Sequence, residues 1–167
     1  HRKVLTGILG VAGVALELHD AALVALDKLD KIGGEGVEKD LLARGVETNA
    51  ASRLLKFFTE LAELDHAAEI AAGEDPETKQ QALNKAVLGR IVEFVGDNEM
   101  GSRGVDELQA IVEYACAAGI GNRLQIDPSL ARGLSYYTGA IMEISVKDLA
   151  GSLGGGGRYD NLVGMFA

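Results

Sequence analysis

Two short segments in the C-terminal third of the chain combine residue types suited to chemistry on a small polar molecule. They are residues 130–139, with the sequence LARGLSYYTG, and residues 154–160, with the sequence GGGGRYD. Each places an arginine and tyrosine beside glycine, whose missing side chain lets a ligand approach the backbone. This mixture favours a pocket for a polar molecule and a phosphate over a packed core.

Arg132 has the clearest catalytic chemistry of these residues. An arginine next to a glycine at the start of a strand can hold a carboxylate or phosphate with two parallel N–H donors. Taken alone, an arginine more often forms a surface ion pair, for example with Asp127. Both interpretations stay open at the level of the single residue.

The adjacent tyrosines Tyr136 and Tyr137 are expected to lie on a strand, where successive side chains point to opposite faces. Only one of them would then point into a given pocket. A phenol hydroxyl can donate to or accept from an imidazole or an amine. For an isolated pair of tyrosines, packing in the core is the competing interpretation.

The glycine run at 154–157 does not match a nucleotide-binding loop. It lacks the lysine and hydroxyl of a P-loop, and its spacing is not that of a dinucleotide-binding motif. The repeat Gly7-x-x-Gly10-x-x-Gly13 fails the same test. The run 154–157 is typical of a strand that another backbone or a ligand approaches closely.

In combination, LARGLSYYTG and the later GGRYDNLVG strongly resemble the two signature segments of histidyl-tRNA synthetases, a family of class II aminoacyl-tRNA synthetases. Residues 2–8 (RKVLTGI) resemble the family segment that leads into a helical insertion, and residues 26–31 (LDKLDK) resemble part of that insertion. The resemblance covers nearly the whole chain, and its specificity rests on residues 126–166.

The resemblance implies that histidine and ATP form histidyl-adenylate, and that the histidyl group then passes to tRNA(His). Negative charge builds on the α-phosphate and on the departing pyrophosphate, so a fixed cation there is the expected catalytic device. Arg132 would be that cation, placed between the histidine carboxylate and the α-phosphate. Tyr137 would contact the imidazole. The histidine-binding residues implied are Tyr136, Tyr137, Tyr159, Gly155, Gly156 and Gly157.

The same resemblance implies ATP, with Mg²⁺ as the counter-ion of the nucleotide and no protein-bound metal. It also implies a cytoplasmic homodimer with no membrane partner. The cysteine and histidine content agrees with this expectation, because the single Cys116 and the three histidines form no metal-binding spacing. One cysteine also excludes an internal disulfide framework and favours a reducing compartment.

The chain departs from the family pattern in two respects. Ser135 stands where the family usually has aspartate, and strand alternation would put it on the face of Tyr137. No motif 1, 2 or 3 and no anticodon-binding domain is recognisable in the 167 residues. We therefore expect an internal fragment of a catalytic domain that is inactive alone. A synthetase-like regulatory subunit of histidine biosynthesis and a stand-alone helical interaction domain are the alternative functions.

The charge of the chain is unevenly spread. The formal net charge is −9, and all of it lies in residues 1–120 because acids and bases balance in residues 121–167. An acidic surface repels phosphate backbones, so any contact with RNA would have to be local and specific for shape.

The start of the chain offers a further alternative. The basic residues His1-Arg2-Lys3 and the uncharged run 4–16 resemble part of a signal peptide, but the run is short and contains three glycines. We expect a buried strand-to-helix entry instead.

Hydrophobic periodicity predicts helices first and antiparallel strands afterwards, an α+β arrangement. The predicted helices cover about 16–32, 36–44, 47–64 and 77–94, with a break near Gly89 left open, and a last one around 108–118 that ends at Gly119 or Gly121. Strands are predicted at Leu124, Ile126, 137–146 and 152–157, with a hairpin connection at 149–151 and a short helical end at 160–166. The predicted domains are 1–39 (strand-to-helix segment of the catalytic domain), 40–105 (helical insertion) and 106–167 (catalytic helix and antiparallel strands).

Overall fold

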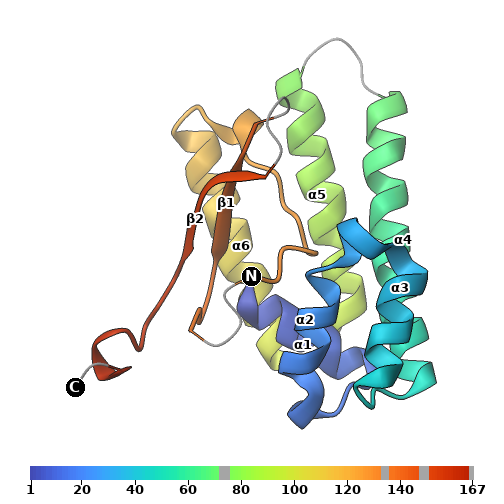
Figure 1. Cartoon of the computed structure of the whole chain (residues 1–167). Coiled ribbons are helices and arrows are strands. Elements are labelled where there is room, and N and C mark those ends of the chain that lie inside the picture. The colour runs from blue at the N-terminus through green and yellow to red at the C-terminus, as the bar shows by residue number, and fades with distance from the viewer. Residues whose placement is uncertain (72–75, 133–135, 147–150, 166–167) are drawn as a thin grey trace.

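A computed structural model describes residues 1–71, 76–132, 136–146 and 151–165 of the chain (Figure 1). Helices precede an antiparallel hairpin, so the predicted α+β class is confirmed. The elements are α1 (Arg2–Ala12), α2 (His19–Leu26), α3 (Leu29–Ala43), α4 (Thr48–Ala71), α5 (Pro76–Val95), α6 (Glu99–Ala117), β1 (Ile141–Ser145) and β2 (Ser152–Gly157), with short 3-10 helices at Leu16–Leu18, Gly121–Arg123 and Val163–Met165.

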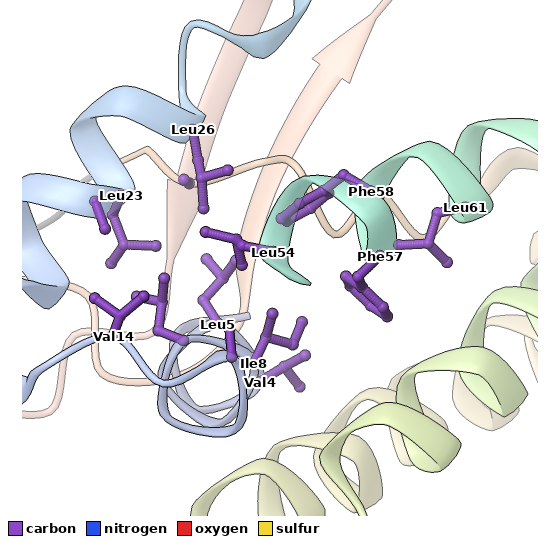
Figure 2. Packing of buried hydrophobic residues seen from close by; sticks show 14 of the residues in the cluster. Val4, Leu5, Ile8, Val14, Leu23, Leu26, Leu54, Phe57, Phe58 and Leu61 are labelled. Carbon is purple, nitrogen blue, oxygen red and sulfur yellow. The ribbon is translucent and has the colours of Figure 1, made fainter. Parts of the chain in front are cut away.

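Helix α1 is the centre of the helical part and contacts α2, α4, α5 and α6. Its apolar side chains recur with helical spacing, and Val4, Leu5 and Ile8 are fully buried. They pack against Leu54 and Phe57 of α4 (Figure 2). The predicted strand-to-helix entry is therefore wrong, because the chain is helical from Arg2 onwards.

Glycines let the backbones of α1 and α6 touch. A Cβ atom on Gly7 would lie 2.5 Å from Cα of Gly101, and one on Gly104 would lie 2.6 Å from the backbone nitrogen of Val4. Real Cβ atoms do not come that close to backbone, and α1 makes more contacts with α6 than with any other element. Gly7 therefore serves helix packing.

Replacing Gly104 by valine is expected to destabilise the fold by about 3 kcal/mol, because two helix backbones must separate to admit the side chain. Gly89→Ala in α5 is the matched control, since nothing lies within 4 Å of a Cβ at that position. Alanine there should stabilise the helix by about 0.5–1 kcal/mol. Urea denaturation followed by circular dichroism measures both changes. Equal stability of the two variants would contradict the close approach of α1 and α6.

Several predicted helix limits differ from the structure. The helix predicted over 16–32 is divided at Asp27 and Lys28, between α2 and α3. The predicted break between residues 32 and 36 is confirmed, because Gly33 interrupts α3 with non-helical angles (φ 67°, ψ 175°) and helical geometry resumes after it. Helix α4 continues beyond residue 64 to Ala71, and α5 is unbroken at Gly89.

Other predicted limits are confirmed. Helix α5 begins at Pro76. Proline lacks a backbone N–H, but the N–H groups in the first turn of a helix have no acceptor within the helix, so no hydrogen bond is lost there. Gly45 follows α3 and Gly119 follows α6, both in the left-handed region (φ 90° and 72°) that ends helices. The helical end predicted over 160–166 is a single 3-10 turn at Val163–Met165.

The strands pair in antiparallel register, with Ile141 opposite Gly157 and Glu143 opposite Gly155. β1 begins at Ile141, four residues later than predicted, because the backbone before it bends at Gly139. The N–H of Thr138 and the carbonyl of Ala140 both bond the backbone of Arg158 (2.9 and 2.8 Å). Ser135, and residues 149–150 of the connection predicted at 149–151, lie outside the described residues.

Leu124 and Ile126 were predicted as strand and are not part of one. The buried amide of Asn84 in α5 takes the place of a strand partner. Its Nδ2 donates to the carbonyl of Leu124 (2.7 Å), and its Oδ1 accepts from the N–H of Ile126 (2.9 Å). A side-chain amide can satisfy a donor and an acceptor of extended backbone at once.

One hydrophobic cluster joins buried residues from Val4 to Ala131 across both predicted domain boundaries. The boundaries near 40 and 105 stay predictions. Among the helices in the described part of the chain, none has the length and apolar composition needed to cross a membrane.

Candidate functional site

Arg132 lies between two carboxylates from distant parts of the chain. Its Nη1 is 2.8 Å from Oε1 of Glu143 in β1, and its Nε is 4.0 Å from Oδ1 of Asp27, between α2 and α3. The ion-pair interpretation of Arg132 is therefore confirmed, with these two acids in place of Asp127. The side chain is 52% exposed, and a guanidinium carries five N–H donors. It can therefore hold an anion while it stays paired to Glu143.

The three predicted site tyrosines lie together. Ring centroids are 4.6 Å apart for Tyr136 and Tyr137, 5.2 Å for Tyr136 and Tyr159, and 6.4 Å for Tyr137 and Tyr159. The expectation that Tyr136 and Tyr137 point to opposite faces is wrong, because Tyr136 occupies a turn. The cluster brings the first signature segment against the second.

The surroundings of Tyr137 favour the neutral form of its hydroxyl. Partial burial raises the pKa of Tyr137 above its ordinary value of 10, and the neighbouring Tyr136 hydroxyl adds to the shift. A neutral phenol offers both a donor and an acceptor. Tyr137 therefore has the chemistry to bond either nitrogen of an imidazole.

The strand register places two of the three predicted glycines on the face that carries Glu143. Residues directly opposite in antiparallel strands share a face, so Gly155 lies beside Glu143 and Gly157 beside Ile141. A Cβ on Gly157 would meet the ring of Tyr137 at 2.8 Å. This face therefore joins Gly155, Gly157, Tyr137 and, through Glu143, Arg132.

Gly156 is not brought together with this group. It lies opposite Met142, on the other face of the hairpin, and nothing lies within 4 Å of a Cβ built on it. Its contact with histidine stays a prediction.

Arg158 links the second signature segment to other elements. Its Nε donates to Oδ1 of Asp160 (2.9 Å), and its Nη1 is 3.3 Å from Oε2 of Glu107 in α6. Thr138 donates its hydroxyl to Oδ2 of Asp160 (2.8 Å). Glu107 was missed because nothing in its local sequence distinguishes it, whereas Thr138 lies within the first signature segment but was given no role.

Asp160→Asn is expected to lower stability at neutral pH, with the difference from the parent shrinking in acid. The hydrogen bond from Arg158, followed by that from Thr138, lowers the pKa of Asp160 below 3.8. A carboxyl group whose pKa is lower in the folded protein than in the unfolded one stabilises the fold at pH values above its unfolded pKa. This stabilisation is lost as the pH falls through the folded pKa. Denaturation curves at pH 7 and at about pH 3 measure the two differences. An equal difference at both pH values would contradict the role of the ionised carboxylate.

A cavity of about 210 Å³ lies elsewhere, between α4, α5 and residues 125–129. Its walls include Leu61, Leu83 and Ile126, and among the described residues that line it the charged one is Asp127. An acid among apolar walls does not suit the phosphates of a nucleotide. Within the part of the chain that the structure describes, no group of three acidic, histidine or cysteine side chains could hold a metal ion.

Comparison with known proteins identifies the family. The family model described as histidyl-tRNA synthetase matches residues 2–167. The histidine–tRNA ligase of Bacteroides fragilis (strain YCH46) is 39% identical over 167 residues, which is 99% of this chain and 32% of the relative. That of Flavobacterium johnsoniae is 38% identical over 169 residues, 99% of this chain and 31% of the relative.

A solved structure agrees with these relatives. The crystal structure of histidyl-tRNA synthetase from Nostoc sp. PCC 7120 matches with a TM-score of 0.72 and 25% identity, over 99% of this chain and 35% of that one. The matched proteins are aminoacyl-tRNA synthetases by name. The chain belongs to the histidyl-tRNA synthetase family, as its signature segments indicated. It spans about one third of the length of these relatives.

Proposed function

We propose that the complete polypeptide containing this chain activates histidine with ATP and transfers the histidyl group to tRNA(His). The observation that supports this function is the convergence of the two signature segments on one face of the hairpin. Arg132, Tyr137 and Gly157 come from both segments and meet there through Glu143 and the strand register. A cation, a neutral phenol and an open backbone surface are the groups that histidine and a phosphate require.

In the first step, an oxygen of the histidine carboxylate forms a bond to the α-phosphorus of ATP while the bond to pyrophosphate breaks. Arg132 would hold the carboxylate and the α-phosphate together and offset the charge that develops on the phosphoryl oxygens. Its pairing with Glu143 fixes the guanidinium before substrate arrives, so less side-chain entropy is lost on binding.

Histidine recognition would fall to the tyrosines and glycines. Tyr137 would bond the imidazole, while Tyr136 and Tyr159 would form the wall around it. Gly155 and Gly157 are exposed and would let the substrate lie against the strand backbone. Gly156 lies on the other face of the hairpin, so it would contribute to histidine binding only through its backbone atoms.

The remaining two thirds of the relatives' length would supply what this chain alone does not. ATP would enter with Mg²⁺ as its counter-ion, and we infer that this chain alone is inactive in histidine activation. A homodimer and a cytoplasmic location belong to the same proposal. The acidity of residues 1–120 would restrict any contact of α1–α6 with tRNA to local sites.

Amino-acid-dependent ATP–pyrophosphate exchange tests the function. The complete polypeptide, assayed with each standard amino acid, should exchange pyrophosphate with histidine alone and should charge tRNA(His). Exchange with another amino acid, or with none, would overturn the proposal. Absence of exchange together with stable binding to a phosphoribosyltransferase would support the regulatory alternative instead.

A further inference from the structure

Glu107 on α6 gathers basic side chains from both ends of the chain. Its carboxylate accepts from Nζ of Lys3, lies 3.0 Å from Nε2 of His1 and lies 3.3 Å from Nη1 of Arg158. The carboxylate is 30% exposed, so these partners replace much of its solvent. One acid with three such partners is more than an isolated surface ion pair, and networks of this kind can fix geometry where single pairs do not.

The contact with Arg158 continues into the second signature segment. Arg158 also bonds Asp160 (2.9 Å), and Asp160 accepts from the hydroxyl of Thr138 (2.8 Å). The stem of Arg158 lies over Gly139, where a Cβ would meet its Cδ at 2.8 Å. The network therefore ties α6 to the chain on both sides of the hairpin.

Tyr159 lies between the two network residues Arg158 and Asp160. Its ring contacts the rings of Tyr136 and Tyr137. Both neighbours of Tyr159 are held by hydrogen bonds, so the backbone from which the ring projects is held as well. The pKa of Asp160 is lowered and that of Arg158 is raised, first by their mutual hydrogen bond, so the pairing favours the charged form of both groups.

We propose that Glu107 is a positioning residue for histidine recognition: by holding Arg158 it keeps Tyr159 in the tyrosine cluster that binds the substrate. The proposal rests on the proposed function of that cluster. Glu107 contacts neither histidine nor ATP in this proposal. Its loss should therefore weaken the affinity for histidine. Small displacements of a positioning group can weaken a site tenfold or more.

The test replaces Glu107 by glutamine in the complete polypeptide. In histidine-dependent exchange, KM for histidine should rise about tenfold, while KM for ATP and the unfolding temperature stay close to the parent. Glu99→Gln is the matched control, because Glu99 also lies on α6 and pairs with Arg103 on the exposed surface. This control should keep the parental KM for histidine.

A double-mutant comparison assigns the effect to the Arg158 contact. Arg158→Gln alone should raise KM for histidine, and adding Glu107→Gln to it should cause little further change. If Glu107→Gln lowers the unfolding temperature by more than about 5 °C, Arg158→Gln tests the same contact by removing the partner of Glu107. An unchanged KM in an active parent background would overturn the role of Glu107 and leave the proposed function intact.

A second readout is independent of activity. With 3-fluorotyrosine incorporated, the ¹⁹F resonance of Tyr159, assigned with Tyr159→Phe, should move in Glu107→Gln and stay in place in Glu99→Gln. An unmoved resonance would overturn the proposal even in a polypeptide without exchange activity. If the resonance moves in a polypeptide that has no exchange activity, the result would support the positioning of Tyr159 by Glu107. It would overturn only the role of Tyr159 in binding histidine.

Discussion

Arg132→Ala in the complete polypeptide is expected to slow histidine-dependent ATP–pyrophosphate exchange by about 100- to 1,000-fold, mainly through kcat. Removing one fixed donor that faces developing charge typically has this effect. Arg132→Lys should recover only part of the rate, since an ammonium keeps the charge and loses the planar fork. Steady-state exchange at saturating histidine and ATP measures both variants.

Arg103→Ala is the matched control for Arg132→Ala. Arg103 is an exposed arginine on α6 that pairs with Glu99, so its loss should leave exchange unchanged. Thermal unfolding of each variant separates catalysis from folding, because Arg132→Ala leaves the half-buried Glu143 without its closest cation. A rate near that of the parent in a folded Arg132→Ala variant would remove Arg132 from the catalytic site.

Gly157→Val is expected to have the second largest effect, an increase of more than about tenfold in KM for histidine. A Cβ there would lie 2.6 Å from the carbonyl oxygen of Ala140 and 2.8 Å from the ring of Tyr137. The hairpin backbone must shift to relieve the contact with the carbonyl, and the ring must move as well. Overpacking of this kind costs about 1–3 kcal/mol. Histidine titrations of the exchange rate and a denaturation curve measure the two effects.

Gly156→Val is the neighbouring comparison. Nothing lies within 4 Å of a Cβ at Gly156, and valine suits a strand. The register predicts a much smaller rise in KM than for Gly157→Val, because Gly156 lies on the face opposite Glu143. Equal effects of the two substitutions would contradict this assignment of faces and favour direct contact of Gly156 with histidine.

Much of the family assignment could be predicted from the sequence because the signature segments are local. LARGLSYYTG and GGRYDNLVG carry their residue types in a fixed order, and the family match over residues 2–167 confirms what they indicated. Order alone also predicts the α+β class, since helical periodicity ends before the glycine-rich strand begins.

The arrangement of the site was less predictable because it depends on contacts between distant residues. Glu107 and Arg158 are 51 positions apart, and Arg132 finds Glu143 and Asp27 on different elements. Strand alternation predicted opposite faces for Tyr136 and Tyr137, but the turn at Tyr136 brings their rings together. Such tertiary contacts leave no periodic pattern in the sequence.

The errors at Leu124 and at the N-terminus have separate causes. Short apolar runs fit a buried strand and a buried helix equally well, and packing against α6 decides for a helix over Arg2–Ala12. Extended backbone at Leu124 indicates a strand only if another strand supplies its hydrogen bonds. Asn84 supplies them instead.

A crystal structure of the complete polypeptide with bound histidine tests the central claim most directly. The account predicts the imidazole against Tyr137 and Tyr159, the carboxylate at Arg132, and the substrate over Gly155 and Gly157. Histidine bound elsewhere, with Arg132 still closed on Glu143 and Asp27 and the tyrosine cluster unoccupied, would contradict it.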